Sequence, residues 1–288
     1  MHIQDTLREY YTKTKGAKRA VAEFLIANFD DIPMLTLDEA SLKIGVSLST
    51  ITRTTSEMGF HGFPDFQKQV WTSVKARLTP SARMGLAAPR LAAQTCNESL
   101  QQDIESVVLA SNLNLESNFD QAASLIAEAS KVYILGIRTA STLSSFSFYA
   151  LSKIRSHVYN LDFGSALEHI EEMKEGSVLF VASFPRYSTF TADIARIVCG
   201  QGGSVIGLTD SPSSPLAPCS KVVLYAPYES VSFFNSMVAP LSVLNVLIVK
   251  INAILGEAGK NHLIQYEELL GRWGVLVEPR NKLKNGRQ

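Results

Sequence analysis

Arginine and hydroxyl side chains are concentrated in two short segments of this sequence, residues 136–141 and 183–188. A guanidinium binds a phosphate or carboxylate through two parallel hydrogen bonds, and hydroxyls donate hydrogen bonds to the same oxygens. Both segments follow apolar runs typical of buried strands, and ligands of open α/β sheets bind beyond the carboxyl ends of the strands. The sequence therefore predicts a site for a small anion, formed by Gly136, Arg138, Thr139, Ser141, Ser183, Arg186, Tyr187 and Ser188.

Each of these side chains also has an ordinary structural role open to it. The hydroxyls can cap or decorate the helices that follow the strands. Arg138 and Arg186 can form structural or interface ion pairs, although burying an unpaired arginine is costly and this favours anion binding. Tyr187 can stack on a ligand or simply pack against its neighbours. At this point both interpretations stand.

Two short helices joined by a tight turn are predicted near the N-terminus. Thr36 or Asp38 can cap the first helix, whose apolar residues are Leu37, Ala40 and Leu42. Gly45 tolerates the left-handed conformation in which helices often end. Ser47 is a good cap for the second helix, residues 48–58, whose predicted buried stripe is Ile51, Thr55 and Met58. The polar residues that this arrangement offers to DNA are Ser47, Ser49, Thr50, Thr52, Arg53 and Ser56.

A helix-turn-helix places its second helix in the major groove of double-stranded DNA. Small polar side chains at the start of that helix can approach base edges, and Arg53 can reach a guanine edge or a phosphate. A plain helical hairpin has the same spacing, so the pattern alone leaves both possibilities open. The formal net charge is zero, with 27 basic and 27 acidic residues, so overall charge gives no support to nucleic-acid binding.

The residues around this turn resemble a known family. Gly45-Val46-Ser47, Thr50-Ile51-Thr52-Arg53 and Met58-Gly59-Phe60-His61-Gly62-Phe63 are similar to the N-terminal domain of the RpiR family of bacterial transcription regulators. In that family a sugar isomerase (SIS) domain follows, and the order of elements in the rest of this chain agrees. The resemblance implies a DNA-binding regulator that senses a small anionic carbohydrate-type effector. Its predicted recognition helix carries Thr52, Thr54 and Thr55, where relatives commonly have bulkier or more basic residues.

The two arginine-containing segments depart from the usual SIS pattern. That pattern is G-x-G-x-S after the first strand and S-x-S-G-x-T after the later one, and both grip a sugar phosphate. Matching positions are Gly136, Ser183 and Ser188. Arg138 stands at the second glycine and Ala140 at the serine, while Pro185 and Arg186 replace Ser-Gly. The resemblance therefore implies an altered effector site, with a sugar phosphate or a sugar acid as the ligand class.

The pattern of apolar residues changes along the chain. Up to about residue 75 it reads as helices only, whereas from residue 131 five apolar runs alternate with helical stretches: KVYILG, HVYNL, SVLFVAS, SVIGLTD and KVVLYAP. This alternation predicts an α/β fold with a doubly wound, mainly parallel five-stranded sheet of the SIS-like kind. The predicted organisation is an all-α helix-turn-helix domain over residues 1–78, a linker over 79–96, and an effector-binding and oligomerisation domain over 97–288.

Residues 232–255 are apolar nearly all round, which predicts burial in the core or at a subunit interface. An operator with two half-sites is bound by two helix-turn-helix units, so we expect a homo-oligomer, at least a dimer. No signal peptide is recognised, and no apolar run is judged long enough to cross a membrane, so we expect a cytoplasmic protein without a membrane partner.

An enzyme is the alternative interpretation, namely a phosphosugar isomerase or lyase of the SIS class. Isomerisation needs a positioned general base, and the candidate pair is Glu168-His169, on a stretch that also fits a solvated helical face. We expect no catalytic residues and no cofactor. The three cysteines, Cys96, Cys199 and Cys219, lack metal-ligand spacing, so no metal site is expected.

Overall fold

The computed structural model describes residues 3–77, 79, 81–84, 96–230 and 233–275. The chain divides into two compact units, residues 1–89 and 90–288. The predicted linker over 79–96 lies mostly outside the described residues.

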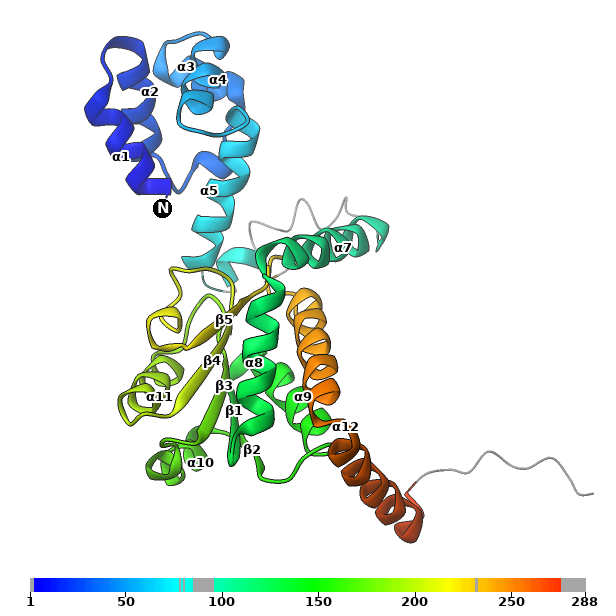
Figure 1. Ribbon diagram of the computed structural model, residues 1–288. Helices are drawn as coiled ribbons and strands as arrows, with labels where there is room; N and C mark the ends of the chain where they lie inside the picture. The colour runs from blue at the N-terminus through cyan, green and yellow to red at the C-terminus, as the bar shows by residue number, and fades with distance from the viewer. Residues whose placement is uncertain (1–2, 78, 80, 85–95, 231–232, 276–288) are drawn as a thin grey trace, which may run out of the picture. The chain divides into compact units, whose positions relative to one another are not determined.

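The first unit is entirely helical in its described part (Figure 1). Its elements are α1 (Ile3–Lys13), α2 (Gly16–Ala27), the 3-10 turn η1 (Ile32–Met34), α3 (Leu37–Ile44), α4 (Leu48–Glu57) and α5 (Phe63–Arg77). Their apolar faces meet in one core that includes Leu7, Leu25, Ile51, Phe66 and Val70. Within it Phe60 lies edge-on to Phe66, with ring centroids 5.0 Å apart. This packing holds α4 against the other helices and leaves one side of it exposed.

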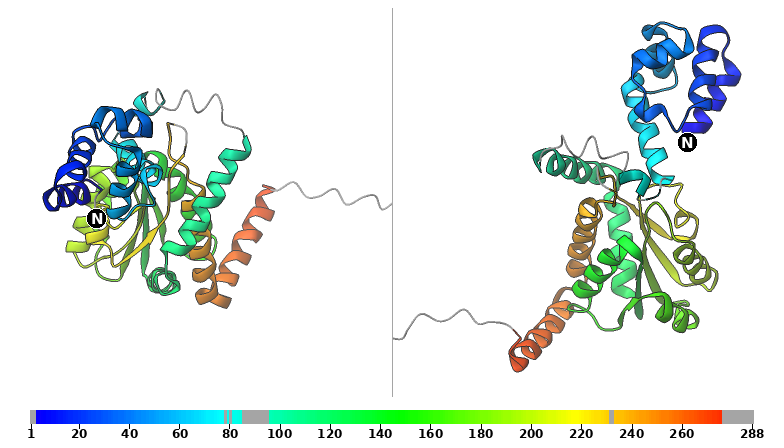
Figure 2. Two further views of the ribbon diagram at one scale, coloured as in Figure 1. Left: turned by 90° about the horizontal axis from the view of Figure 1, so that it is seen from above. Right: turned by 180° about the vertical axis from the view of Figure 1, so that it is seen from behind.

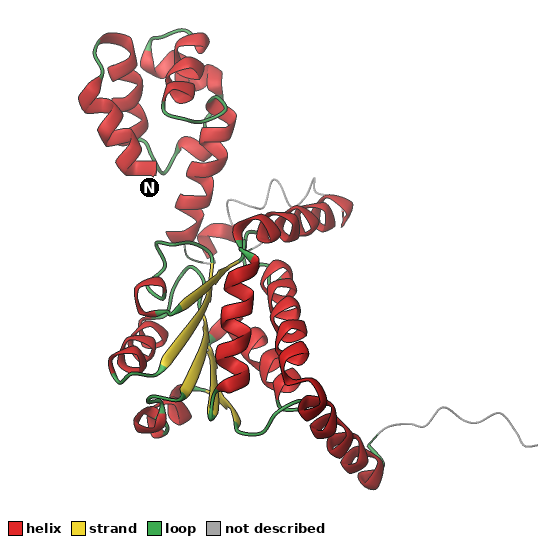
Figure 3. Cartoon of the chain, viewed as in Figure 1, coloured by secondary structure: helices red, strands yellow, loops and turns green. Residues whose placement is uncertain are grey.

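The second unit contains a five-stranded, all-parallel sheet with strand order β2-β1-β3-β4-β5 (Figure 3). The strands are β1 (Lys131–Gly136), β2 (Val158–Leu161), β3 (Ser177–Ala182), β4 (Ser204–Thr209) and β5 (Val222–Tyr225). All five predicted strands are therefore confirmed. Alternate residues of the central strands point to opposite faces and are buried on both, which explains why the sequence shows continuous apolar runs.

Helices cover both faces of this sheet (Figures 1 and 2). One face packs against α8 (Glu116–Glu128), α9 (Ser141–Leu151) and α12 (Val238–Trp273), and α7 (Cys96–Leu113) packs on α12. The other face packs against α10 (Phe163–Glu168) and α11 (Thr189–Gly200). Short 3-10 turns η2 (Arg138–Ala140), η3 (Ile170–Glu172) and η4 (Ala217–Cys219) complete the unit. The predicted doubly wound fold is confirmed.

Helix α12 contains residues 238–255 of the apolar segment singled out in the sequence, and Gly256, which has a positive φ, divides the helix into two parts. The helix is long and apolar enough to cross a membrane by length and composition, with a mean hydropathy of 2.0 over its most apolar window. The prediction that no apolar run reaches this length was therefore wrong. A third of that window, 33%, is buried, because Val243, Leu247 and Ile251 pack into the core beside the sheet.

Candidate functional sites

Capping interactions define the turn between α3 and α4. The Oγ1 of Thr36 accepts a hydrogen bond from the Glu39 backbone N–H at 3.2 Å, and a Glu39 carboxylate oxygen accepts one from the Thr36 N–H at 2.8 Å. Gly45 ends α3 with a left-handed φ of 73°, as predicted. The Oγ of Ser47 then caps α4 by accepting from the Thr50 N–H. These interactions fix the ends of both helices and hence the angle at which α4 is presented.

The buried side of α4 differs in part from the prediction. Ile51 and Thr55 are buried as expected, but Met58 is only half-buried and Thr54 is fully buried. On α3, Leu42, one of the three apolar residues expected on this helix, is 83% exposed. Leu42 follows Ala40 by two residues, which is about 200° around a helix of 3.6 residues per turn. It must therefore point away from the core that Ala40 enters.

The residues predicted to face DNA lie along α4 and its cap. Ser47, Ser49, Arg53 and Ser56 are exposed, while Thr50 and Thr52 are half-buried. The hydroxyl of Ser47 lies 2.9 Å from that of Ser49 and 2.8 Å from that of Thr50, so the three form one polar cluster at the start of the helix. Such a cluster can donate to and accept from base edges or phosphates.

A polar network at the end of α4 was not found from the sequence. Glu57 accepts hydrogen bonds from Lys18 Nζ at 2.7 Å and from the Tyr10 hydroxyl at 2.6 Å. Burial and the bond to Glu57 raise the pKa of Tyr10 to about 12, and Lys18 lowers the pKa of Glu57. The network joins α4 to α1 and α2. These residues are 39 and 47 positions apart, so no local signal marks the contact.

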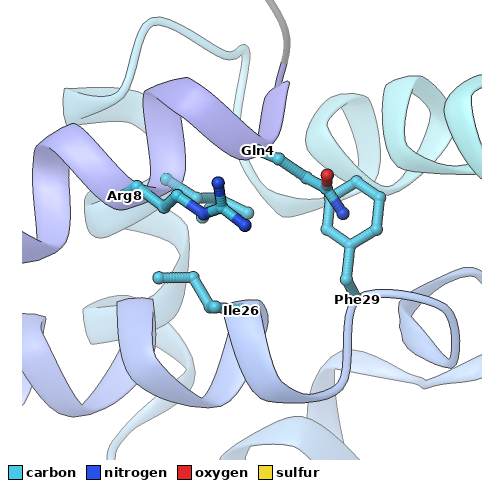
Figure 4. A pocket seen from close by; sticks show the side chains of 5 residues that line it. Gln4, Arg8, Ile26 and Phe29 are labelled. Carbon is cyan, nitrogen blue, oxygen red and sulfur yellow. The ribbon is translucent and has the colours of Figure 1, made fainter.

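A small hollow lies between α1 and α2 (Figure 4). Its lining residues are Gln4, Leu7, Arg8, Ile26 and Phe29. Its volume of about 50 Å³ is far below the roughly 300–1,000 Å³ of metabolite pockets. It is not a candidate effector site.

The two arginine-containing segments lie side by side in the second unit. Because β1 and β3 are neighbours, with Gly136 in register with Ala182, the loops after them share the carboxyl edge of the sheet. The Arg138 guanidinium donates a hydrogen bond to the main-chain oxygen of Arg186 over 3.3 Å. In the strand order β2-β1-β3-β4-β5, the chain passes from β1 to β2 on one side and from β3 to β4 on the other side. The strand order therefore reverses between β1 and β3, and open sheets of this kind bind ligands at such a reversal point.

The backbone of the first loop is unusual at Arg138, which has a left-handed φ of 59°. This conformation suits glycine and costs a residue with a Cβ roughly 1–2 kcal/mol. Two positions earlier, a Cβ on Gly136 would lie 2.4 Å from the Ala140 carbonyl oxygen, so only glycine fits there. The backbone of this loop therefore has the conformation that glycine favours at residue 138, although an arginine with an exposed side chain stands there.

The predicted hydroxyls divide into free and locally bonded groups. Ser141 donates to the Arg138 carbonyl at 2.6 Å, and Ser188 caps α11 by accepting from the Thr191 N–H. Ser183 is buried directly after β3, while Thr139 is exposed. Ser141 and Ser188 therefore have the local structural roles that the sequence left open. The exposed residues of the predicted set are Arg138, Thr139, Ser141 and Arg186, and of these the Ser141 hydroxyl is bonded within its own loop.

Tyr187 has a partner that was not anticipated. Its hydroxyl donates to Asp210 Oδ1 at 2.7 Å. Burial raises the pKa of Asp210, and burial together with the Asp210 charge raises the pKa of Tyr187. Asp210 directly follows β4, so the strand-end reasoning that found the arginines could have included it. The pair ties the 183–188 loop to the next strand end.

The candidate isomerase pair lies elsewhere in the second unit. Glu168 is exposed at the end of α10, and the His169 ring packs against Tyr133, with ring centroids 5.7 Å apart. His169 also lies 3.7 Å from Glu172, which binds Lys131 at the first residue of β1. This is the amino end of the strand, whereas Arg138 and Arg186 follow the carboxyl ends of β1 and β3. The structure does not bring Glu168 and His169 to the predicted anion site.

Two family models match the chain. The "Helix-turn-helix domain, rpiR family" matches residues 1–76, and the "SIS domain" matches residues 125–250. An HTH-type transcriptional regulator in the aarA 3' region of Providencia stuartii is 21% identical over 239 residues, covering 83% of this chain and 85% of that protein. The regulator HexR of Pseudomonas aeruginosa is 23% identical over 286 residues, covering 93% and 95%.

A solved structure has the same fold. It is the NanR protein of Vibrio vulnificus, complexed with ManNAc-6P, with a TM-score of 0.59 and 17% identity over 94% of this chain and 98% of that one. The order of a helical N-terminal region and a parallel α/β domain is therefore shared along nearly the whole chain.

Proposed function

Since the chain belongs to the RpiR family, with an rpiR-type helix-turn-helix followed by a SIS domain, we propose that it is a transcription regulator controlled by a small anion. The first unit binds double-stranded DNA. The second binds an anionic carbohydrate-type effector, a sugar phosphate or a sugar acid, and this changes the affinity for the operator.

The observation that carries DNA binding is the capped α3–turn–α4 unit. Its α4 presents a cluster of hydroxyls at its start and an exposed Arg53 one turn later. A helix with its core side buried and its polar side open is the form in which recognition helices enter a major groove. The proposed contacts are made by Ser47, Ser49, Thr50, Thr52, Arg53 and Ser56.

Two arginines at one sheet edge support the effector site. Exposed cationic side chains beside the starts of α9 and α11 make a field that favours an anion. Arg138 and Arg186 would bind its phosphate or carboxylate, with Thr139 and Tyr187 beside them. Because NanR was solved with ManNAc-6P, phosphosugars are the first probes to try.

A second copy of the chain is the proposed partner in solution. Three exposed apolar residues, Leu100, Ile104 and Val108, are spaced by four along α7 and so share one face, and Val249 is 68% exposed on α12. An apolar face of this kind marks an interface. A dimer would supply the two helix-turn-helix units that two half-sites need, and the protein would act in the cytoplasm.

We further propose that the protein does not convert its effector in a catalysed reaction. The support for this proposal is that the matching relatives are named transcriptional regulators and that Glu168 and His169 lie away from the arginines. An isomerase would need a general base within hydrogen-bond reach of the substrate.

A thermal-shift screen of sugar phosphates and sugar acids on the full chain tests the effector. At a hundred times its dissociation constant a ligand stabilises the folded state by about 2.7 kcal/mol. A compound that raises Tm is then added to a titration with DNA selected by the protein from a random duplex pool. The proposal fails if no duplex is enriched, or if no anion alters both Tm and DNA affinity.

A further inference from the structure

The turn between α1 and α2 concentrates positive charge in a chain with no net charge. Between Glu9 and Glu23 the sequence has four basic residues, Lys13, Lys15, Lys18 and Arg19, and no acidic residue. Lys13 ends α1, Lys15 immediately precedes α2, and the other two lie in the first turn of α2. This local charge is what phosphate binding requires, whatever the overall charge.

The structure anchors this turn next to the recognition helix. Lys18 and Tyr10 both bind Glu57, the last residue of α4, which lies one helical turn beyond Arg53. Figure 1 shows the α1–α2 turn at the same end of the helical unit as α3 and α4, and the reverse view in Figure 2 agrees. The basic turn therefore borders the exposed side of α4.

The four basic side chains have different partners. Lys18 is committed to Glu57, and Lys13 pairs with Glu9 at 2.5 Å. Lys15 and Arg19 are exposed, and neither forms an ion pair with an acidic side chain in the described part of the chain. The Arg19 guanidinium lies over the Tyr11 ring, 4.5 Å from its centroid, and donates to the Tyr11 hydroxyl at 3.0 Å. Stacking holds this charge in place before any ligand arrives.

We propose that Lys15 and Arg19 form a phosphate clamp, binding the DNA backbone beside the bases that α4 reads. This proposal rests on the proposed DNA-binding function. A helix in the major groove has a phosphate backbone on either side, and contacts from a neighbouring element fix its register without reading sequence. Lys18, by neutralising Glu57, removes the acidic charge that α4 would otherwise turn toward the phosphates.

The salt dependence of DNA binding measures such contacts directly. We would titrate the full chain with a duplex selected by the wild-type protein and with an unselected duplex, over roughly 50–200 mM salt. Lys15→Gln and Arg19→Gln should each reduce the slope of log K against log salt by about 0.9, and the double variant by about twice that. The affinity for both duplexes should fall by the same factor, so their ratio should stay unchanged.

Three controls separate the clamp from other effects. Lys15→Arg keeps the charge and should keep the wild-type slope. Lys260→Gln removes an exposed lysine of α12, paired with Glu257, and should change nothing. Arg53→Ala should change the ratio between selected and unselected DNA, since it reads bases.

Unchanged slopes in Lys15→Gln and Arg19→Gln, with Arg53→Ala still impaired, would overturn the clamp and leave DNA binding by α4 intact. A loss confined to the selected duplex would also overturn it, because it would indicate base reading. If the wild-type chain selects no duplex, the proposed function fails and the clamp fails with it.

Discussion

The guanidinium of Arg138 and the main-chain oxygen of Arg186 are joined by a hydrogen bond of 3.3 Å, across the gap between neighbouring strand ends. A main-chain oxygen is a weak partner for a guanidinium compared with a phosphate or carboxylate, which offers two charged acceptors. An anion at this edge can therefore replace the Arg186 oxygen as the partner of the Arg138 guanidinium, which would break the hydrogen bond between the two loops.

Arg138→Gly separates the role of the side chain from that of the backbone. Glycine relieves the left-handed φ of 59°, a gain of about 1–2 kcal/mol, which offsets the roughly 0.4–1 kcal/mol that its greater freedom costs through the unfolded state. We expect equal or slightly higher stability together with loss of effector binding. Chemical denaturation and thermal shift with the identified effector check both. A stable variant that still binds the effector would show that Arg138 is not a ligand-binding residue.

Arg53→Ala should weaken binding to the selected duplex by about 1–3 kcal/mol, the usual cost of a lost base contact. The fold should be unaffected because Arg53 is exposed. A gel-shift titration measures the affinity, and circular dichroism confirms the helical content. Wild-type affinity in this variant would remove Arg53 from the DNA surface.

A fragment beginning at about residue 95 should fold and oligomerise without binding DNA. Its sheet and the helices on both faces form a core of their own. Val249→Glu, which places a charge on the exposed side of α12, should shift the fragment toward monomer. Light scattering reports both, with Lys260→Gln as a surface control. A monomeric parent fragment would refute the interface assignment.

The Asp210 carboxyl should make stability depend on pH. Burial raises its pKa in the folded state, so the folded chain holds this proton more tightly than the unfolded chain. From the unfolded value of about 3.9 up to the raised folded value, the contribution of Asp210 to stability therefore falls as pH rises. Below this window the penalty is absent, and above it the penalty is complete. In Asp210→Asn this dependence should disappear.

Tm measured against pH tests this, with Asp193→Asn on the exposed side of α11 as the control. Relative to wild type, Asp210→Asn should gain stability as pH rises through the window. Parallel curves for wild type and Asp210→Asn would mean that the buried carboxyl carries no such penalty.

Most of the fold could be predicted from the sequence because its signals are local. Apolar runs buried on both faces identified all five strands, and Gly45 and Ser47 marked the turn between α3 and α4. The exposure of Leu42 could also have been predicted from helical periodicity, because Leu42 lies on the opposite side of α3 from Ala40. The burial of Thr54 could not be read from the sequence, because a threonine gives no apolar signal and its burial depends on how α4 packs against the other helices.

The candidate sites could be predicted only in part from the sequence. Strand ends brought Arg138 and Arg186 together as expected, since parallel neighbours share an edge. The pairing of Tyr187 with Asp210 and that of Lys18 with Glu57 join residues 23 and 39 positions apart. Such contacts depend on tertiary packing, and a single sequence has no local pattern for them.

The most direct test of the account is a DNA titration with and without the effector that the thermal screen identifies, using wild type, Arg138→Ala and Arg186→Ala. Wild type should change its DNA affinity by about 5–150-fold, the range of a 1–3 kcal/mol coupling. Both variants should bind DNA as wild type does without effector and should show no response to it. If both respond at the wild-type effector concentration, the arginines are structural and the effector binds elsewhere.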